Sequence, residues 1–336
     1  MPPTLDRFTG CVLGQCLGDA LGSPVEGQPG ALCAYYVEEE LRVGKVGRSR
    51  GSMPFGQYTD DSQMMRELLQ SYLASQGFDP ADYAKRIVAL FAEDRIVGYG
   101  KSTLQAVKRL EQGIPWDQAG TPPPGEGNGS AMRAAAVGLI SYDDLPRLAQ
   151  LCHQQGIITH QGPRCTAGAI AIAGGVALAL QDRVEVNEFS QTLADLAAPS
   201  SQEVASYLRL LPQWVQLPPA QAFLQIERKG RPASYFDDWS GTISPFVIPS
   251  VLWSLYSFLR HPNNYWETIC TSIWPGGDVD TTAAMAGALS GARLGESALP
   301  AEWVGLVQDR GTWTAPELRA LASDVYHHKH AHPTKE

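Results

Sequence analysis

The chain has 336 residues, of which 44% are hydrophobic and 18% are charged, and its formal net charge is −9. This composition is typical of a globular protein that can bury a substantial core, and it excludes a chain that is disordered along its whole length. The acidic balance, with a sequence pI of about 5.3, argues against non-specific nucleic-acid binding as the main activity.

Signals for a cellular compartment or a membrane are weak. The six cysteines form no CxxC pair, so we expect reduced, mostly buried thiols in a cytoplasmic protein. The first eight residues include Asp6 and Arg7 and lack the apolar stretch of a secretory signal. The longest apolar runs, at 166–180 and 246–259, fall short of the roughly 20 residues that span a membrane. Buried helices explain them better.

Helical periodicity dominates the chain, whereas strand-like alternation is scarce. The best strand candidate, 43–46, is interrupted by Gly44. Apolar residues recur at helical spacing from Met64 to Leu73. Further helix candidates are 82–91, 101–110, 130–140, 145–155, 165–180, 186–196, 201–211, 249–259, 265–273, 281–294 and 315–325. The sequence therefore predicts an all-α fold.

Several of these helices are rich in alanine and glycine, notably at 166–175 and 283–292. Glycine weakens an isolated helix by about 1 kcal/mol relative to alanine, but it allows another backbone to approach closely. We therefore expect a compact, orthogonal multi-helix domain over residues 1–326. The His-rich segment 327–336 is expected to be a flexible tail.

The first segment that carries chemistry is 14–27, where glycines surround Asp19 and a Pro/Gly turn contains Glu26. Asp19 lies on a mainly apolar helix, so it could cap or pair with a neighbouring element. A single glutamate in a loop, such as Glu26, is usually solvated.

Two acidic clusters stand before helix candidates, Thr59-Asp60-Asp61 and Asp278-Val279-Asp280-Thr281. Each cluster alone is explained by helix capping. Together they hold more carboxylates than caps require, and those carboxylates need a counter-charge. Mg²⁺ or Mn²⁺ fits oxygen ligands of this kind, whereas the absence of Cys and His from both clusters argues against zinc. Adjacent aspartates can serve two ions about 3.5–4 Å apart.

Two further motifs are weaker. The Gly127-Asn128-Gly129-Ser130 turn leads into a helix candidate, and backbone amides at such a turn can bind phosphate. It lacks the lysine of a P-loop. His160, in Thr159-His160-Gln161-Gly162-Pro163, is a single loop histidine, and most such residues have a structural role.

In this order, the five motifs resemble the ADP-ribosylglycohydrolase family. The matching patterns are GxxLGDALGxPxEG at 14–27, YTDDSQM at 58–64, GNGSAMR at 127–133, THxxP at 159–163 and GGDxDTxAAMAGAxxGAxxG at 276–295. They span nearly the whole chain. The first, second and last are specific in combination.

The resemblance implies an all-α hydrolase that removes ADP-ribose from an acceptor with two Mg²⁺ or Mn²⁺ ions. The implied metal ligands are Thr59, Asp60, Asp61, Asp278, Asp280 and Thr281, with Asp280 as the bridge. Implied substrate contacts come from Gly127, Asn128, Gly129, Ser130 and His160. Glu26, Asp61 and Asp278 are the catalytic candidates, and Glu26 also matches a glutamate that can gate the cleft.

The acceptor stays open among ADP-ribosyl-arginine, ADP-ribosyl-serine and esters such as O-acetyl-ADP-ribose. Glu126 stands where some members of the family place an aromatic residue or an aspartate near the substrate. Two other functions are possible from the sequence. One is a catalytically silent ADP-ribose-binding or structural protein, and the other is a two-metal hydrolase of a different nucleoside or phosphate compound.

Overall fold

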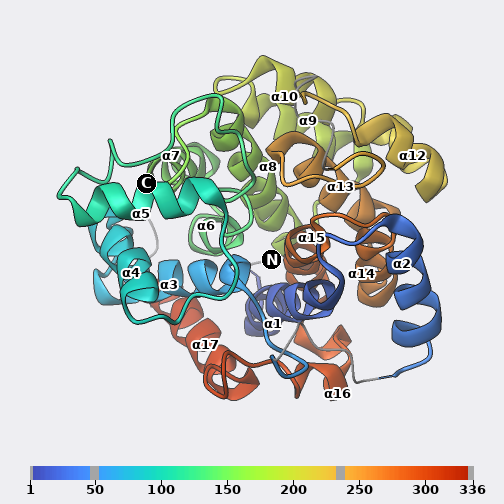
Figure 1. Ribbon diagram of the computed structural model, residues 1–336, viewed down its shortest axis with the longest axis horizontal. Coiled ribbons are helices and arrows are strands. Elements are labelled where there is room, and N and C mark those ends of the chain that lie inside the picture. The colour runs from blue at the N-terminus through green and yellow to red at the C-terminus, as the bar shows by residue number, and fades with distance from the viewer. Residues whose placement is uncertain (1–2, 46–52, 232–238, 332–336) are drawn as a thin grey trace.

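The computed structural model describes residues 3–45, 53–231 and 239–331, which are mainly helical (Figure 1). These residues contain no strand, and their extended segments form only isolated bridges. The all-α expectation is confirmed.

The α-helices follow one another along the chain as α1 (Leu5–Gly22), α2 (Gly30–Tyr36), α3 (Asp60–Ala74), α4 (Pro80–Ala92), α5 (Lys101–Glu111), α6 (Ala135–Ile140), α7 (Leu145–Ile157), α8 (Pro163–Leu180), α9 (Val186–Ala197), α10 (Gln202–Leu208), α11 (Leu211–Val215), α12 (Pro219–Ile226), α13 (Val247–Arg260), α14 (Tyr265–Ile273), α15 (Val279–Leu294), α16 (Ala301–Val304) and α17 (Ala315–Ala331). The described residues also include short 3-10 turns at Ser23–Val25 and Glu296–Ala298 and a π turn at Val37–Leu41.

Helices α1 and α15 pack backbone to backbone at the centre of the fold, where Figure 1 shows them side by side. A Cβ atom added to Gly14 would lie 2.5 Å from the carbonyl oxygen of Gly287, and one added to Gly22 would lie 2.5 Å from the Cα of Asp280. Real side chains cannot approach so closely, so glycine is required at these positions. The glycines thereby bring the start of α15, with Asp280, against the end of α1.

Helix α8 is long and apolar enough to cross a membrane by length and composition alone, but 89% of its apolar window is buried inside the protein. Its neighbours include α6, α7, α9, α13 and α15. The burial fits a core helix, as the sequence indicated.

Several helix boundaries differ from the expectations. The predicted helix at 130–140 begins only at Ala135, because residues 128–134 are wound by short-range bonds such as Ala131 N to Asn128 O (2.7 Å). The predicted helix at 201–211 splits into α10 and α11, with Pro212 in the first turn of α11, where its missing N–H costs nothing. Helices α2, α12 and α16 were not predicted.

Residues 327–331, which the sequence assigned to a flexible tail, continue α17. Lys329 is 3% exposed and its Nζ lies 2.7 Å from the Asp143 carboxylate. His330 packs against Phe8 and Tyr326. These contacts hold the last turn of α17 against α1 and against the segment between α6 and α7. Residues 332–336 lie outside the described part of the chain.

The strand candidate at 43–46 falls partly outside the described residues. Its first two residues form a turn after the π turn, and Lys45 carries no regular structure. No strand is therefore found over the described part of this segment, 43–45.

Candidate metal centre and binding cleft

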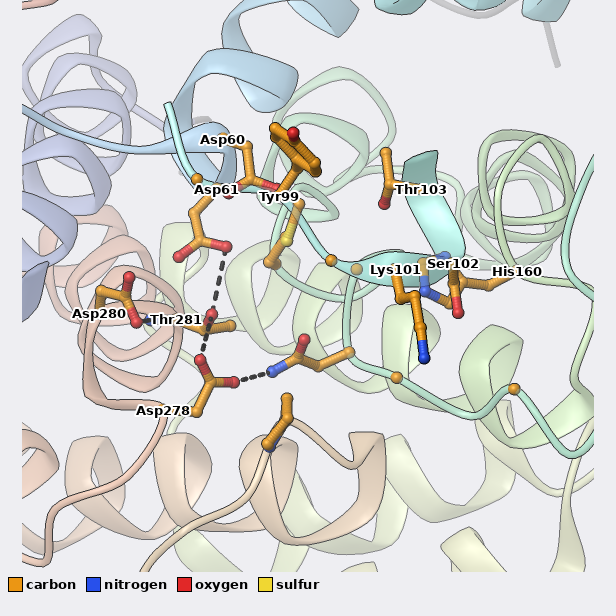
Figure 2. Close-up of a pocket in the computed structure, with 18 of the residues that line it drawn as sticks. Asp60, Asp61, Tyr99, Lys101, Ser102, Thr103, His160, Asp278, Asp280 and Thr281 are labelled. Atoms are coloured by element: carbon orange, nitrogen blue, oxygen red, sulfur yellow. Dashed lines mark hydrogen bonds between the residues drawn. The ribbon is translucent and has the colours of Figure 1, made fainter. Parts of the chain in front are cut away.

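The two acidic clusters meet at one point. The Thr281 hydroxyl lies 3.2 Å from Asp61 Oδ1 and 3.2 Å from Asp278 Oδ1, which joins residues 220 positions apart in the sequence. Figure 2 shows Asp60, Asp61, Asp278, Asp280 and Thr281 gathered on one side of a cavity. The fold thus assembles the oxygen-rich site that the sequence suggested.

Simple capping explains neither cluster. Thr59 and Asp278 occupy the N-cap positions of α3 and α15, yet neither side chain accepts a capping bond from its own helix. The cap of α3 comes instead from α1. Asp19 accepts from the backbone N–H groups of Thr59 (3.0 Å) and Ser62 (3.1 Å) and from both hydroxyls (2.9 and 2.6 Å). The carboxylates of Asp60 and Asp61 are therefore not needed to cap α3.

Carboxylate oxygens fall into two overlapping groups that could each hold a cation. One group is Asp19, Asp61 and Asp280, and the other is Glu26, Asp278 and Asp280, with the oxygens of each group within 4.8 Å of one another. Asp280 belongs to both. Because Asp19 already accepts four hydrogen bonds from Thr59 and Ser62, Asp61 and Asp280 are the better ligands in the first group.

Burial makes negative charge in these groups costly. It raises the pKa of Asp61 well above its usual range, and the negative charges of Asp19 and Asp280 raise it further. Burial, followed by the charge of Glu26, raises the pKa of Asp278 to about 7. Asp61 Oδ2 is buried with no hydrogen-bond partner among the described residues. A hard cation would neutralise this charge and occupy that orphaned oxygen.

Asp278 is held by Asn128. The Asn128 side-chain amide donates to Asp278 Oδ2 (2.5 Å) and to the Ser250 hydroxyl (2.9 Å). Asn128, expected to contact substrate, therefore also supports the acidic cluster. Its backbone N–H donates to Pro245 O (3.0 Å), which fixes the loop beside the cavity.

The Glu26 loop is tied to the turn that precedes α15. Gly27 N donates to Gly277 O (2.8 Å), and Gly277 N donates to Gln28 O (3.0 Å). Gly276 and Gly277 have φ values of 77° and 92°, a region that favours glycine. The glycine pair of the last motif therefore allows the turn that places Glu26 beside Asp278.

The cavity has a volume of about 380 Å³, and most of the predicted site residues line it. Asp60, Asp61, Asp278, Asp280, Thr281 and Glu26 line the acidic side, and Gly127, Asn128, Gly129 and His160 line other parts. Two predicted residues do not. The Thr59 hydroxyl donates to Asp19, and the buried Ser130 hydroxyl donates to Cys165 O (3.0 Å). Their roles as a metal ligand and a substrate contact stay predictions.

Sequence reasoning missed one whole wall of the cavity. Residues 98–103, at the start of α5, line it together with Glu126, Met132, Trp239 and Pro245. Figure 2 shows Lys101 and Ser102 across the cavity from the four aspartates. The available signal was Gly98-Tyr99-Gly100 directly before a helix that begins with Lys101, which could have been recognised as a second Gly-rich turn.

Fold and site together define an all-α protein with a cluster of acidic residues on one side of a cavity. The profile of the ADP-ribosylglycohydrolase family matches residues 1–334. The chain belongs to this family, and the expected class of enzyme, a hydrolase that removes ADP-ribose, is thereby confirmed.

Individual relatives extend over the same length. The chain is similar to the ADP-ribosylhydrolase ARH3 of Gallus gallus, with 31% identity covering 90% of this chain and 88% of that protein. It is also similar to the ADP-ribosylarginine hydrolase Tri1 of Pseudomonas putida, with 26% identity covering 96% of this chain and 78% of the relative. A solved ADP-ribosylglycohydrolase-related protein complex superimposes with a TM-score of 0.70 and 25% identity, over 97% of this chain and 98% of that one.

Proposed function

We propose that this protein hydrolyses the bond between ADP-ribose and an acceptor with two Mg²⁺ or Mn²⁺ ions held by the acidic clusters. The observation that carries the proposal is the pair of carboxylate groups that share Asp280 on one side of the cavity. Asp60, Asp61 and Asp280 would hold one ion, and Asp278, Asp280 and Thr281 the other, with Thr59 as a further predicted ligand.

Divalent cations bound there would orient the ribose hydroxyls and acidify a water molecule. The residues of the chain then have separate tasks. Glu26, Asp61 and Asp278 are the carboxylates that could accept the proton of the attacking water, since all three line the cavity. Thr281 links Asp61 to Asp278 through its hydroxyl. Asn128 fixes the orientation of Asp278.

The Gly127–Gly129 turn supports binding of the diphosphate of ADP-ribose. Gly127 and Gly129 line the cavity, and their backbone N–H groups donate to no acceptor within the described ranges. A Cβ on Gly129 would lie 2.5 Å from His160 Cε1, so the turn and this histidine form one continuous surface. Backbone amides without an acceptor in a Gly-rich turn beside a cavity can bind anionic oxygens.

A substrate panel tests the proposal. The purified protein, with Mg²⁺ or Mn²⁺ supplied, is given ADP-ribosyl-arginine, ADP-ribosyl-serine, O-acetyl-ADP-ribose and a simple phosphate ester. We expect release of ADP-ribose from at least one conjugate and no hydrolysis of the ester. Hydrolysis of the ester alone would favour a two-metal hydrolase of another compound, and tight ADP-ribose binding without cleavage would favour a silent binding protein.

We also propose a cytoplasmic location. The support is that all six cysteines are free and buried, as is typical of proteins from reducing compartments. Fractionation of the native cells, with immunodetection of the protein, tests this location.

A further inference from the structure

His160 has a fixed backbone and one edge of its ring directed to the cavity. Its N–H donates to Gly156 O (2.8 Å), and the next residue donates to Thr121 O (2.9 Å). The side chain is 3% exposed and lines the cavity. A Cβ placed on Gly127 would lie 3.4 Å from Nε2. Nε2 therefore lies beneath the Gly127–Gly129 turn, where the diphosphate is proposed to bind.

The other ring nitrogen belongs to a chain of hydrogen bonds. Arg133 Nη2 donates to Thr159 Oγ1 (2.9 Å), and Thr159 Oγ1 lies 2.8 Å from His160 Nδ1. A guanidinium can only donate, so Thr159 accepts from Arg133. Thr159 is fully buried, and its hydroxyl proton has no other acceptor among the described residues. The hydroxyl therefore donates to Nδ1, and the ring proton of the neutral imidazole is on Nε2.

Arg133 is itself held by neutral acceptors. It is fully buried, and its guanidinium donates to Gln155 Oε1 (2.6 Å) and Gln155 O (2.6 Å). Within the described residues no carboxylate forms an ion pair with it. Gln155 Nε2 in turn donates to Ser130 O (2.8 Å), which ties the same network to the end of the Gly127–Ser130 turn.

Protonation of His160 would oppose this network. An imidazolium would direct an N–H at the Thr159 hydroxyl, so that the hydroxyl proton would lose its acceptor, Nδ1. Burial, followed by the charge of Arg133, lowers the pKa of His160 to about 3. The ring is therefore neutral over the physiological pH range.

We propose that Arg133 and Thr159 are positioning residues that fix His160 as a neutral Nε2–H donor, which binds an acceptor oxygen of an anionic ligand in the cleft. The nature of that oxygen, a phosphoryl oxygen of ADP-ribose, rests on the proposed function. His160 would then bind the ligand without transferring a proton.

The tautomer can be measured without any ligand. Long-range ¹H–¹⁵N correlation spectra of ¹⁵N-histidine-labelled full-length protein distinguish the two forms, with His160→Gln identifying the His160 signals. We expect a pyridine-type Nδ1 and a pyrrole-type Nε2 in the wild type and in Thr159→Ser. In Thr159→Val we expect a mixture of tautomers, because the donor to Nδ1 is lost. A pyrrole-type Nδ1 in the wild type overturns the proposal.

Calorimetric affinity for ADP-ribose measures the consequence for binding. We expect Thr159→Val to weaken binding about threefold to tenfold, in line with one weakened hydrogen bond, and Thr159→Ser to restore it. Thr268→Val is the matched control, because Thr268 is also fully buried but its hydroxyl donates only to the His261 and Asn264 carbonyls, just before α14. Equal affinities for Thr159→Val and the wild type would overturn the proposal.

The two experiments separate this proposal from the proposed function. If the wild type binds no ADP-ribose, the proposed function and the identity of the bound oxygen both fail, while the ¹⁵N spectra still decide the tautomer. If ADP-ribose binds but Nδ1 carries the proton, the proposed function stands and the positioning role of Thr159 fails.

Discussion

The acidic residues in and behind the cleft have different roles. Asp19 uses both carboxylate oxygens to cap α3 from a different helix, whereas Asp61 Oδ2 is buried without a hydrogen-bond partner among the described residues. The sequence showed that the acids exceed what caps require. It could not show which acid serves as the cap, because the donor and acceptor are 40 residues apart.

Asp19→Asn should lower the free energy of unfolding by roughly 2 kcal/mol, because an amide keeps one acceptor oxygen and turns a donor toward Thr59 or Ser62. Urea unfolding of the two proteins, followed by circular dichroism, measures the difference. Asp79→Asn is the matched control. Asp79 caps α4 through one oxygen only, and asparagine replaces such a cap almost without loss. Equal losses in both variants would contradict the two-oxygen cap.

His160 should make the protein sensitive to acid. Its pKa is lowered from about 6.5 to about 3 in the folded state, so below pH 6.5 the unfolded chain binds a proton that the folded protein excludes. Stability contributed by the neutral ring is complete above pH 6.5 and is lost as the pH falls toward 3.

Unfolding free energies of the wild type and His160→Gln, measured between pH 7 and 4.5, test this dependence. Their difference should change in favour of the variant by up to about 1.4 kcal/mol per pH unit below pH 6.5. The exposed His153, replaced by glutamine, is the control for loss of a histidine. A difference that stays constant with pH would show that the pKa of His160 is not lowered in the folded state.

Among the elements, α1 and α15 determine the geometry of the centre. Their glycines were visible in the sequence as close-packing residues, and the structure shows the partner of each. Helix boundaries were predictable where glycine or proline ends or begins a periodic run, as at α14 and α9. They were not predictable at 130–134, where the contacts of Asn128 and Arg133 with distant residues override the local helical tendency.

Gly14→Ala should destabilise the protein by about 3 kcal/mol or more, because the new Cβ would meet the backbone of Gly287. Thermal unfolding measures the change. Gly305→Ala is the control, since a Cβ there would meet only ordinary contacts at 3.6 Å with helical backbone φ, and a change within about 0.5 kcal/mol is expected. If Gly14→Ala were as stable as Gly305→Ala, the two helices would be farther apart than described.

On the scale of the whole molecule, the cleft exists only because the Glu26 loop, α3, α5, α15 and the 125–129 turn converge. The sequence supplied the acidic residues and, through the family motifs, their grouping. It did not supply the α5 wall or Trp239, because their place beside the cavity depends on long-range packing.

Binding of a divalent cation to the acidic clusters of the cleft should stabilise the whole fold. A ligand at a hundred times its dissociation constant adds about 2.7 kcal/mol to the free energy of unfolding. Thermal unfolding of metal-depleted wild type should therefore shift upward with Mg²⁺ or Mn²⁺, and Asp280→Asn should shift much less. An identical shift in Asp280→Asn would place the cation elsewhere.

The most direct test is the hydrolysis rate of metal-depleted protein, titrated with Mg²⁺ or Mn²⁺, on the best conjugate of the substrate panel. The account predicts saturable recovery of activity in the wild type and in Asp195→Asn, an exposed aspartate of α9. It predicts a loss of roughly a hundredfold or more in Asp280→Asn with the fold retained. Full turnover by Asp280→Asn, or by the metal-depleted wild type, would contradict it.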